Sequence, residues 1–156
     1  MPDRSIRDYA LYRLEKAADE LDTAQIDFNA GKYNAAANRA YYAIFHAIRS
    51  VLALDEKEFS KHSGTLGYFS KEYLATETVN RRFSAVIKKA SAVRNAGDYD
   101  DFYEVEREEA AELIEKAAEF HQELVGYVSL RLDGQTQLDS PNADQDEDFG
   151  NPTLTL

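Results

Sequence analysis

The stretch NRAYYAIFHAIRSVL, residues 38–52, is the most informative part of this chain about its fold. In and just before it, apolar side chains recur at steps of three and four, the spacing of one helix face: Ala37, Tyr41, Ile44, Ile48 and Val51. A second face carries only small side chains, which allow another helix to come close: Ala36, Ala40, Ala43 and Ala47. A helix covered on several sides lies at the centre of a bundle, so the stretch predicts an all-α fold built around it.

Helical spacing continues on both sides of this stretch. An apolar stripe predicts a first helix at residues 10–28, which ends at Gly31 and forms an antiparallel hairpin with the second. Further helices are predicted at about residues 62–73, 83–93 and 106–132. The end of the fourth helix is predicted from Asn95, Gly97 and Asp98. No strand pattern competes, so we predict an up-and-down helical bundle of about five helices.

Beyond Leu132 the composition changes to Gly, Gln, Asp, Asn, Ser and Pro without a helical period. Such a segment buries too little apolar surface to order itself. We therefore predict two parts: a helical bundle at residues 1–132 and a disordered, flexible acidic tail at residues 133–156.

The composition argues against several classes of protein. The chain has 156 residues, the size of one domain, and no apolar run near the roughly 18 residues that a membrane span needs. It has no Cys and no apolar leader at its N-terminus, so we expect a protein of the reducing cytoplasm that does not enter a membrane. Its three histidines are far apart in sequence, and Walker, GxGxxG, HExxH and Glu-x-x-His motifs are absent. We expect no metal and no cofactor.

The net charge of −11 is unevenly distributed along the chain. Residues 32–97 hold eleven basic and five acidic residues, a net charge of +6, whereas the flanking segments are acidic. Within this middle segment, several basic residues have no acidic residue between them: Arg81, Arg82, Lys88, Lys89 and Arg94. Two interpretations stay open. The predicted fourth helix presents these cations to phosphate groups, or it is a solvated face that the acidic fifth helix neutralises.

A polar row lies on another face of the second helix, at positions i, i+3, i+7 and i+10: Arg39, Tyr42, His46 and Arg49. One interpretation is a groove that holds phosphate or donates hydrogen bonds. The other is that Tyr42 and His46 are buried and satisfied by backbone groups or by Asp on a facing helix.

The segment RNAGDYDDFY, residues 94–103, is dense in polar and aromatic side chains and directly follows the predicted fourth helix. Loops mounted on a helical scaffold often carry function, so this segment is expected to be an exposed functional loop.

Four segments in this order resemble the HEPN family (higher eukaryotes and prokaryotes nucleotide-binding), particularly its small stand-alone prokaryotic members: NRAYYAIFHAIRSVL at 38–52, KHSG at 61–64, RNAGDYDDF at 94–102 and EEAAELIEKAAEF at 108–120. The resemblance covers most of residues 5–130. It implies a compact helical bundle that forms a homodimer and is often encoded beside a minimal nucleotidyltransferase. In many members the protein is the toxin of a toxin-antitoxin pair.

Active HEPN proteins resemble metal-independent ribonucleases that use an Arg, a following polar residue and a His a few positions later, brought together across a dimer. Here Arg94 and Asn95 match the first two places, but Tyr99 stands where the His is expected. A Tyr with a pKa of about 10 is a poor proton-transfer group at neutral pH. The resemblance therefore implies that Arg94 binds phosphate, that Asp98 holds Arg94 in place, and that Tyr99 packs or stacks. His46 or His62 could replace the missing His in space.

Three hypotheses follow from the sequence. The first is a dimeric HEPN-type module that pairs with a nucleotidyltransferase-like protein and binds phosphate, RNA or its partner, with Tyr99 or Tyr103 as a candidate acceptor hydroxyl for nucleotidyl transfer. The second is a metal-independent endoribonuclease toxin that uses Arg94 and Asn95. The third is a purely structural helical interaction protein.

Overall fold

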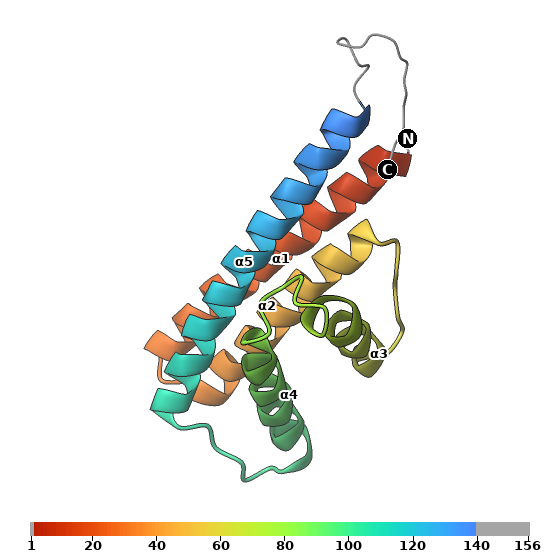
Figure 1. Ribbon diagram of the computed structural model, residues 1–156. Helices are drawn as coiled ribbons and strands as arrows, with labels where there is room; N and C mark the ends of the chain where they lie inside the picture. Colours follow the sequence, from red (N-terminus) through yellow and green to blue (C-terminus); the bar gives the residue numbers. More distant parts are fainter. Residues whose placement is uncertain (1, 140–156) are drawn as a thin grey trace, which may run out of the picture. The chain divides into compact units, whose positions relative to one another are not determined.

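The structure is a computed structural model that describes the backbone of residues 2–139 and the side chains of residues 6–97 and 100–134. Over these residues it has five α-helices and one π-helical turn, η1, and it contains no strand: α1 Pro2–Asn29, α2 Tyr33–Leu54, α3 His62–Phe69, η1 Ser70–Leu74, α4 Phe83–Tyr99 and α5 Arg107–Asp139 (Figure 1). The predicted all-α fold with about five helices is confirmed. No helix in the described part of the chain is long and apolar enough to cross a membrane.

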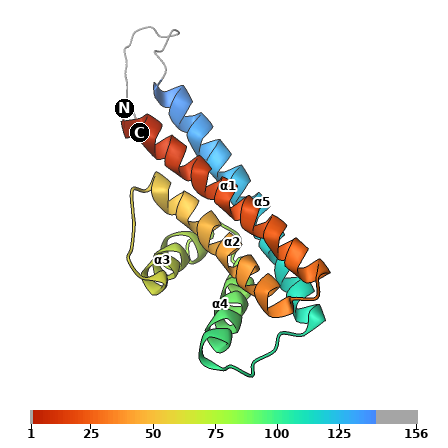
Figure 2. The same ribbon diagram turned by 180° about the vertical axis from the view of Figure 1, so that it is seen from behind.

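The chain divides into two compact units, one up to Val125 and one from Gly126 onward. In the first unit, α1 and α2 form the predicted antiparallel hairpin, joined by a turn in which Gly31 has a φ of +78°. That conformation favours glycine because a Cβ atom would strain it. Seen from both sides, α3 and α4 lie on the opposite side of α2 from α1 (Figure 1 and Figure 2). Helix α2 is therefore covered by several neighbours, as its faces predict.

The core of the first unit is built from small residues of α1 and α2 and from aromatic rings around Phe120 of α5. Ala17 and Ala24 of α1, like Ala40 and Ala47 of α2, are fully buried. The ring of Phe120 meets Phe69 and Phe83 edge to face, with centroids 5.7 and 5.2 Å apart. These contacts join α3, α4 and the first half of α5. The second unit contains the rest of α5, where an Arg131 N–H donates to the Tyr127 hydroxyl at 3.1 Å.

The predicted end of the fourth helix is wrong. Helix α4 continues through Asn95 and Gly97 to Tyr99, and the chain becomes extended only at Asp100 (φ −135°, ψ 103°). Gly and Asn lower helix propensity by no more than about 1 kcal/mol each, so they do not end a helix that other contacts support. Arg94 and Asn95 consequently lie on a helix and not on an exposed loop, which is limited to residues 100–106.

The fifth helix is also longer than predicted, since it continues past Leu132 to Asp139. Gly134 is the weakest helix former of its added turns, and no Pro occurs between Leu132 and Pro141. The first residues of the predicted tail, 133–139, thus form the last turns of α5. Its remaining residues, 140–156, lie outside the described part of the chain, and the division into a 1–132 domain and a tail stays a prediction.

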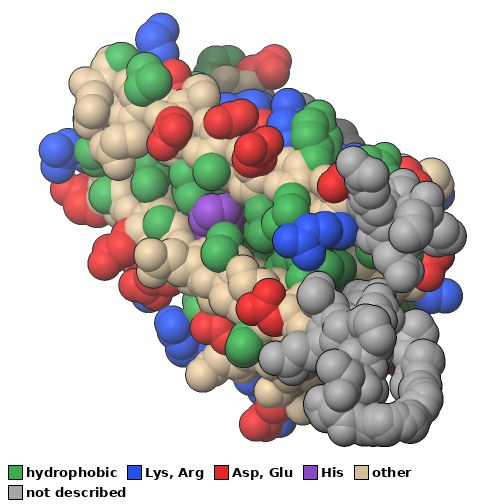
Figure 3. Space-filling model, turned by 90° about the horizontal axis from the view of Figure 1, so that it is seen from above, with side chains coloured by type: hydrophobic (Ala, Val, Ile, Leu, Met, Phe, Trp, Pro, Cys, Tyr) green, Lys and Arg blue, Asp and Glu red, His purple; other side chains and the backbone are tan. Residues whose placement is uncertain are grey.

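Large apolar side chains remain exposed on the surface. Tyr9 and Tyr12 of α1 are about half exposed, and Phe102 of the loop before α5 is 91% exposed. Figure 3 shows one face of the molecule, on which hydrophobic side chains lie between scattered Asp and Glu side chains. Exposed rings on an acidic protein are available for contacts with ligands or partners.

Candidate functional site

The main candidate site is formed where α3 and α4 meet over α2. Its guanidinium comes from Arg94 on α4 and its imidazole from His62, the first residue of α3. Arg94 Nη1 lies 3.4 Å from His62 Nδ1, although the two residues are 32 positions apart in sequence. Both side chains are partly exposed. The structure thus places His62, one of the two histidines considered as replacements for the missing His, directly beside Arg94.

Three aromatic side chains of α2 surround this pair. The Tyr41 hydroxyl lies 2.8 Å from His62 Nδ1, and the Phe45 ring stacks on the imidazole with centroids 4.1 Å apart. The guanidinium of Arg94 lies over the Tyr41 and Tyr42 rings, at 5.2 and 5.7 Å from their centroids. Such cation–π and stacking contacts hold Arg94 and His62 in place. We call these five residues the Arg94 site.

The protonation of the Arg94 site follows from its surroundings. Burial lowers the pKa of His62 below its usual value, and the positive charges of Arg94 and Arg49 lower it further. Burial raises the pKa of Tyr41, although Arg94 opposes this shift. At neutral pH His62 is therefore neutral and Tyr41 is protonated. Because a guanidinium can only donate, Nδ1 of His62 accepts, and this assignment places the ring hydrogen on Nε2.

Helix α3 is held in position by a carboxylate at the end of α2. Asp55 Oδ2 accepts hydrogen bonds from the hydroxyls of Tyr68 at 3.0 Å and Tyr73 at 2.6 Å. Tyr73 lies in η1, and the extra residue of a π-turn rotates the helix there. Gly64 of the KHSG segment approaches Phe59 so closely that a Cβ atom would lie 3.1 Å from the Phe59 Cβ. The glycine therefore permits the close approach of α3 to the preceding loop.

The structure describes only part of the predicted catalytic set. Asn95 is exposed on α4, next to Arg94. The side chains of Asp98 and Tyr99 lie outside the described residues, so their predicted roles stay predictions.

The predicted polar row of α2 is divided between two environments. Tyr42 belongs to the Arg94 site, whereas Arg39 forms an ion pair with Glu20 of α1 at 2.8 Å and Arg49 forms one with Glu58 at 3.4 Å. His46 Nδ1 accepts from Arg13 Nη1 of α1 at 3.4 Å. The side chains of this polar row thus contact Glu and Arg side chains. The sequence had suggested Asp or backbone groups as partners for Tyr42 and His46 if they were buried.

His46 lies in a strongly positive environment. Burial lowers its pKa to about 4, aided by the charges of Arg13, Lys16, Arg49 and Arg39. Glu20 Oε2 lies 3.9 Å from Nε2, a contact that would by itself raise the pKa. Burial and four cations outweigh one carboxylate at that distance, so His46 is neutral at pH 7.

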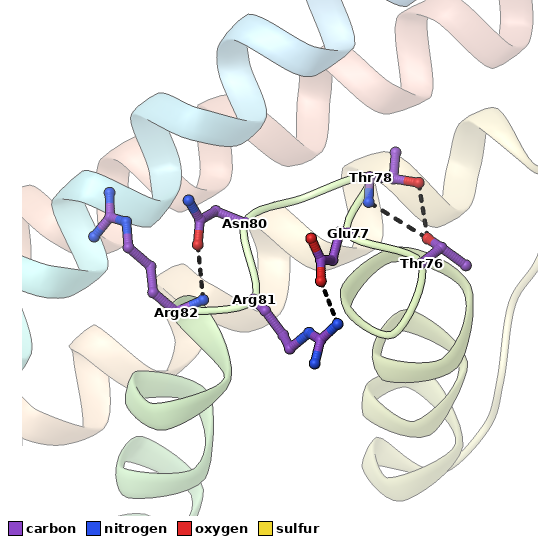
Figure 4. Close-up of polar contacts among 6 residues, drawn as sticks. All are labelled: Thr76, Glu77, Thr78, Asn80, Arg81 and Arg82. Carbon is purple, nitrogen blue, oxygen red and sulfur yellow. Dashed lines mark hydrogen bonds and ion pairs between the residues drawn. The ribbon is translucent and has the colours of Figure 1, made fainter.

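Most of the predicted basic surface near α4 is paired with acidic residues. Arg81 contacts Glu77, and the Asn80 side chain accepts from the backbone N–H of Arg82 at 2.9 Å (Figure 4). Arg82 and Lys89 reach Glu119 and Glu109 of α5, at 3.3 and 2.8 Å. Lys88 is exposed, and no ion pair forms to it within the described residues. This arrangement favours the interpretation of a solvated face that the fifth helix neutralises.

Two members of the Arg94 site were not predicted. Tyr41 belongs to the predicted apolar stripe of α2, and Phe45 belongs to no predicted stripe. Their spacing to Tyr42 places all three rings along one edge of the helix. Within the described part of the chain, no group of three His, Asp or Glu side chains gathers in a way that would hold a metal ion.

Comparisons with known proteins agree with this architecture. The model of the family described as HEPN domain matches residues 10–127. A UPF0332 protein of Thermotoga maritima is 33% identical over 109 residues, which cover 70% of this chain and 83% of the relative. Two proteins of Methanocaldococcus jannaschii are also similar. One, named "Putative toxin MJ0142", is 33% identical over 66% of this chain and 70% of its own length. The other, named "Putative toxin MJ0605", is 30% identical over 75% of this chain and 87% of its own length.

The matched region, residues 10–127, includes every residue of the Arg94 site and most of the described helices. From the extent of this match and from the helical architecture, the chain belongs to the HEPN domain family.

Proposed function

We propose that this chain is a toxin-type HEPN module that binds RNA through phosphate groups at the Arg94 site. The observation that carries the proposal is the pairing of Arg94 with His62 on an aromatic surface, with 3.4 Å between Nη1 and Nδ1. Two relatives with the word toxin in their names support the toxin type.

The hydrogen-bond donors of the site suit a phosphate. Arg94 presents a guanidinium, which matches phosphate oxygens with parallel N–H groups. His62 carries its hydrogen on Nε2 when Nδ1 accepts from Arg94, so it presents a further donor. Tyr42 and His62 are both partly exposed, and an aromatic ring next to a cation can contact the base that adjoins the phosphate. The set therefore favours binding of a phosphate and an adjoining base.

We also propose, from the family, that the chain forms a homodimer in the cytoplasm and pairs with a nucleotidyltransferase-like protein. Light scattering of the purified chain measures its oligomeric state. Co-purification with a nucleotidyltransferase-like protein encoded beside it tests the partnership. A monomer that does not bind such a protein at micromolar concentration contradicts this part of the proposal.

A second function, metal-independent RNA cleavage, is favoured by the closeness of a guanidinium and an imidazole. Cleavage requires that Nε2 of His62 accept a proton from a ribose 2′-hydroxyl. This needs the other tautomer, in which Nδ1–H donates to the Tyr41 oxygen 2.8 Å away while Arg94 moves to the phosphate. The low pKa of His62 keeps the ring neutral and therefore able to accept a proton at pH 7.

One experiment separates the two functions. RNA binding and RNA cleavage are measured in EDTA for the wild type, Arg94→Ala, His62→Gln and Tyr99→His, with Arg82→Ala as a control because Arg82 pairs with Glu119 outside the site. We expect Arg94→Ala to weaken RNA binding at least about tenfold. His62→Gln keeps a donor near the position of Nε2 but cannot transfer a proton, so it retains binding and abolishes any cleavage.

The outcomes are distinct. Cleavage by the wild type that disappears in both Arg94→Ala and His62→Gln identifies a ribonuclease. Binding without cleavage identifies a binding module, and cleavage by Tyr99→His alone identifies a lapsed nuclease. RNA affinity that is equal in the wild type and Arg94→Ala contradicts the proposed function.

A further inference from the structure

Besides the Arg94 site, the structure has a cavity at the open end of the α1–α2 hairpin. It lies next to the loop that leads to α3. It is a cavity of about 220 Å³ between the first turns of α1, the last turns of α2 and residues 56–58. Its lining includes Tyr9 and Arg13 of α1 and Arg49 of α2. None of these three residues packs in the apolar core.

The charges of this cavity are arranged for an anion. Arg13 and Lys57 make no ion pair with any described residue, and they line the cavity together with Arg49. The acidic residues on the lining are Glu56 and Glu58. Glu58 contacts Arg49 at 3.4 Å, but its side chain is 70% exposed, so it can leave Arg49 when a stronger anion arrives.

The cavity also has an aromatic wall. Tyr9 is 51% exposed, and the Arg13 guanidinium lies 5.6 Å from the centre of its ring. The exposed ring of Tyr12 on the same helix also lies 5.7 Å from Arg13, but Tyr12 does not line the cavity. Exposed rings next to cations that lack a carboxylate partner are the combination that binds single-stranded nucleic acids, because bases stack on the rings and phosphates contact the cations.

The cavity and the Arg94 site are joined by one side chain. The Arg49 guanidinium lies 5.8 Å from the centre of the Phe45 ring, and that ring stacks on His62 at 4.1 Å. Arg49 is also close enough to His62 to lower its pKa. A chain of side-chain contacts therefore links Arg94 to the cavity through His62, Arg49 and the buried ring of Phe45.

We propose that this cavity binds one nucleotide of a single-stranded RNA whose neighbouring phosphate occupies the Arg94 site. The base stacks on Tyr9, and phosphates of the strand contact Arg13, Lys57 and Arg49 after Glu58 turns away. The proposal rests on the proposed function, since it assigns the path of the same RNA strand, and it names the substrate class as single-stranded.

The test measures fluorescence anisotropy of a labelled single-stranded RNA of about six nucleotides, a length within the range of known single-strand sites. The variants are Tyr9→Leu, Arg13→Gln and Lys57→Gln, and the matched controls are Tyr12→Leu and Arg81→Gln. Lys57 is exposed and makes no described ion pair, so its variant tests the site without risk to folding. Arg81 pairs with Glu77 away from the cavity.

We expect Tyr9→Leu to weaken binding about tenfold through lost stacking. Arg13→Gln and Lys57→Gln should each lower the slope of log affinity against log salt by about 0.7, the value for one phosphate contact of a single strand. Tyr9→Leu should leave that slope unchanged. The two controls should bind as the wild type does.

Wild-type affinity in Tyr9→Leu, Arg13→Gln and Lys57→Gln would overturn the proposal, as would an equal loss for duplex RNA or DNA. Failure of the proposed function looks different. In that case Arg94→Ala binds RNA normally, whereas the cavity variants still lose affinity, and the cavity is then an RNA site that does not depend on Arg94.

Discussion

Two Arg–His pairs in the described part of the molecule have the same contact between guanidinium and imidazole. The residues that surround the two pairs differ. Arg13 and His46 join α1 to α2, and Arg94 and His62 join α4 to α3. In both, a guanidinium nitrogen lies 3.4 Å from Nδ1, and burial and positive charge lower the pKa of the histidine. Both imidazoles are therefore neutral at pH 7 and carry their hydrogen on Nε2.

The second nitrogen distinguishes the pairs. Nε2 of His46 faces Glu20 at 3.9 Å, and the His46 side chain is only 14% exposed, so this ring is enclosed by protein. His62 is partly exposed and surrounded by aromatic rings, and it makes no ion pair with a described carboxylate. An enclosed imidazole contributes to packing, whereas an open one beside a guanidinium is available to a ligand. The surroundings of each pair, and not the Arg–His contact itself, therefore indicate function.

The largest expected effect concerns His46 and the stability of the fold. Its pKa is about 4 in the folded chain and 6.5 when unperturbed, so the unfolded chain binds more protons between these values. Above pH 6.5 His46 is neutral in both states and does not lower the free energy of unfolding. As the pH falls from 6.5 to 4, the free energy of unfolding decreases by about 2 to 3 kcal/mol. Urea denaturation at pH 7 and pH 4.5 measures it.

The control for this prediction is His46→Gln, which cannot titrate. The difference between its free energies of unfolding at the two pH values should be smaller than that of the wild type by about the same 2 kcal/mol. Equal pH dependence in both proteins would show that His46 is not the buried, enclosed group described above.

The next effect concerns Arg94 and ligand binding. Arg94→Ala should lose about 2 kcal/mol of RNA affinity, or about thirtyfold, with little change in urea stability because the side chain is partly exposed. Anisotropy and urea denaturation measure the two quantities. Arg39→Ala is a useful counterpart, since Arg39 pairs with Glu20 and should leave RNA affinity unchanged. Equal losses in both variants would remove the distinction between the two regions.

A smaller effect is expected from Tyr41→Phe. The Tyr41 hydroxyl lies 2.8 Å from Nδ1 of His62, and its donation to this nitrogen stabilises the neutral ring. Its removal should raise the pKa of His62 toward 6.5 and cost about 1 kcal/mol of stability. Imidazole NMR shifts followed across pH 5 to 8 measure the pKa. A pKa that falls in Tyr41→Phe would show that the hydroxyl accepts from Nδ1–H instead.

The smallest effect comes from a pair of glycines in α3. A Cβ atom at Gly67 would meet no neighbouring segment of the described chain within 4 Å, so Gly67→Ala should stabilise the chain by about 0.5 to 1 kcal/mol. Gly64→Ala places its Cβ 3.1 Å from Phe59 and should lose that gain, with a shift of α3 and His62. Thermal denaturation compares them. A Gly64→Ala variant as stable as Gly67→Ala would show that α3 does not depend on this close approach.

Much of the fold could be predicted because helix periodicity is a local property. The apolar steps of α1, α2 and the first part of α5 appear within single segments. The small-residue edge predicts that another helix comes close to α2, and its residues Ala40 and Ala47 are fully buried. The ends of α4 and α5 were predicted too early. Gly97 and Gly134 lower helix stability only slightly, and both helices continue through them. A prediction that ends a helix at a single glycine therefore places the end too early.

The candidate site was only partly predictable. Arg94, Tyr42 and His62 were each named from the sequence, but as members of separate motifs. Tyr41 and Phe45 were missed as site residues, since an aromatic residue on an apolar stripe looks the same in sequence whether it packs in the core or also holds a neighbour. The aromatic rings take both roles here, because one edge of α2 faces α3 and α4.

The sequence by itself determined that the chain is an all-α protein of the HEPN family type, because helical spacing and the order of its segments are written along the chain. The histidine that contacts Arg94 is known only from the packing of the helices. The packing of α3 and α4 on α2 places His62 next to Arg94. His46 instead contacts Arg13 of α1. The contact between His62 and Arg94 depends on how α2, α3 and α4 pack together. A local sequence pattern does not predict the distance between these two side chains.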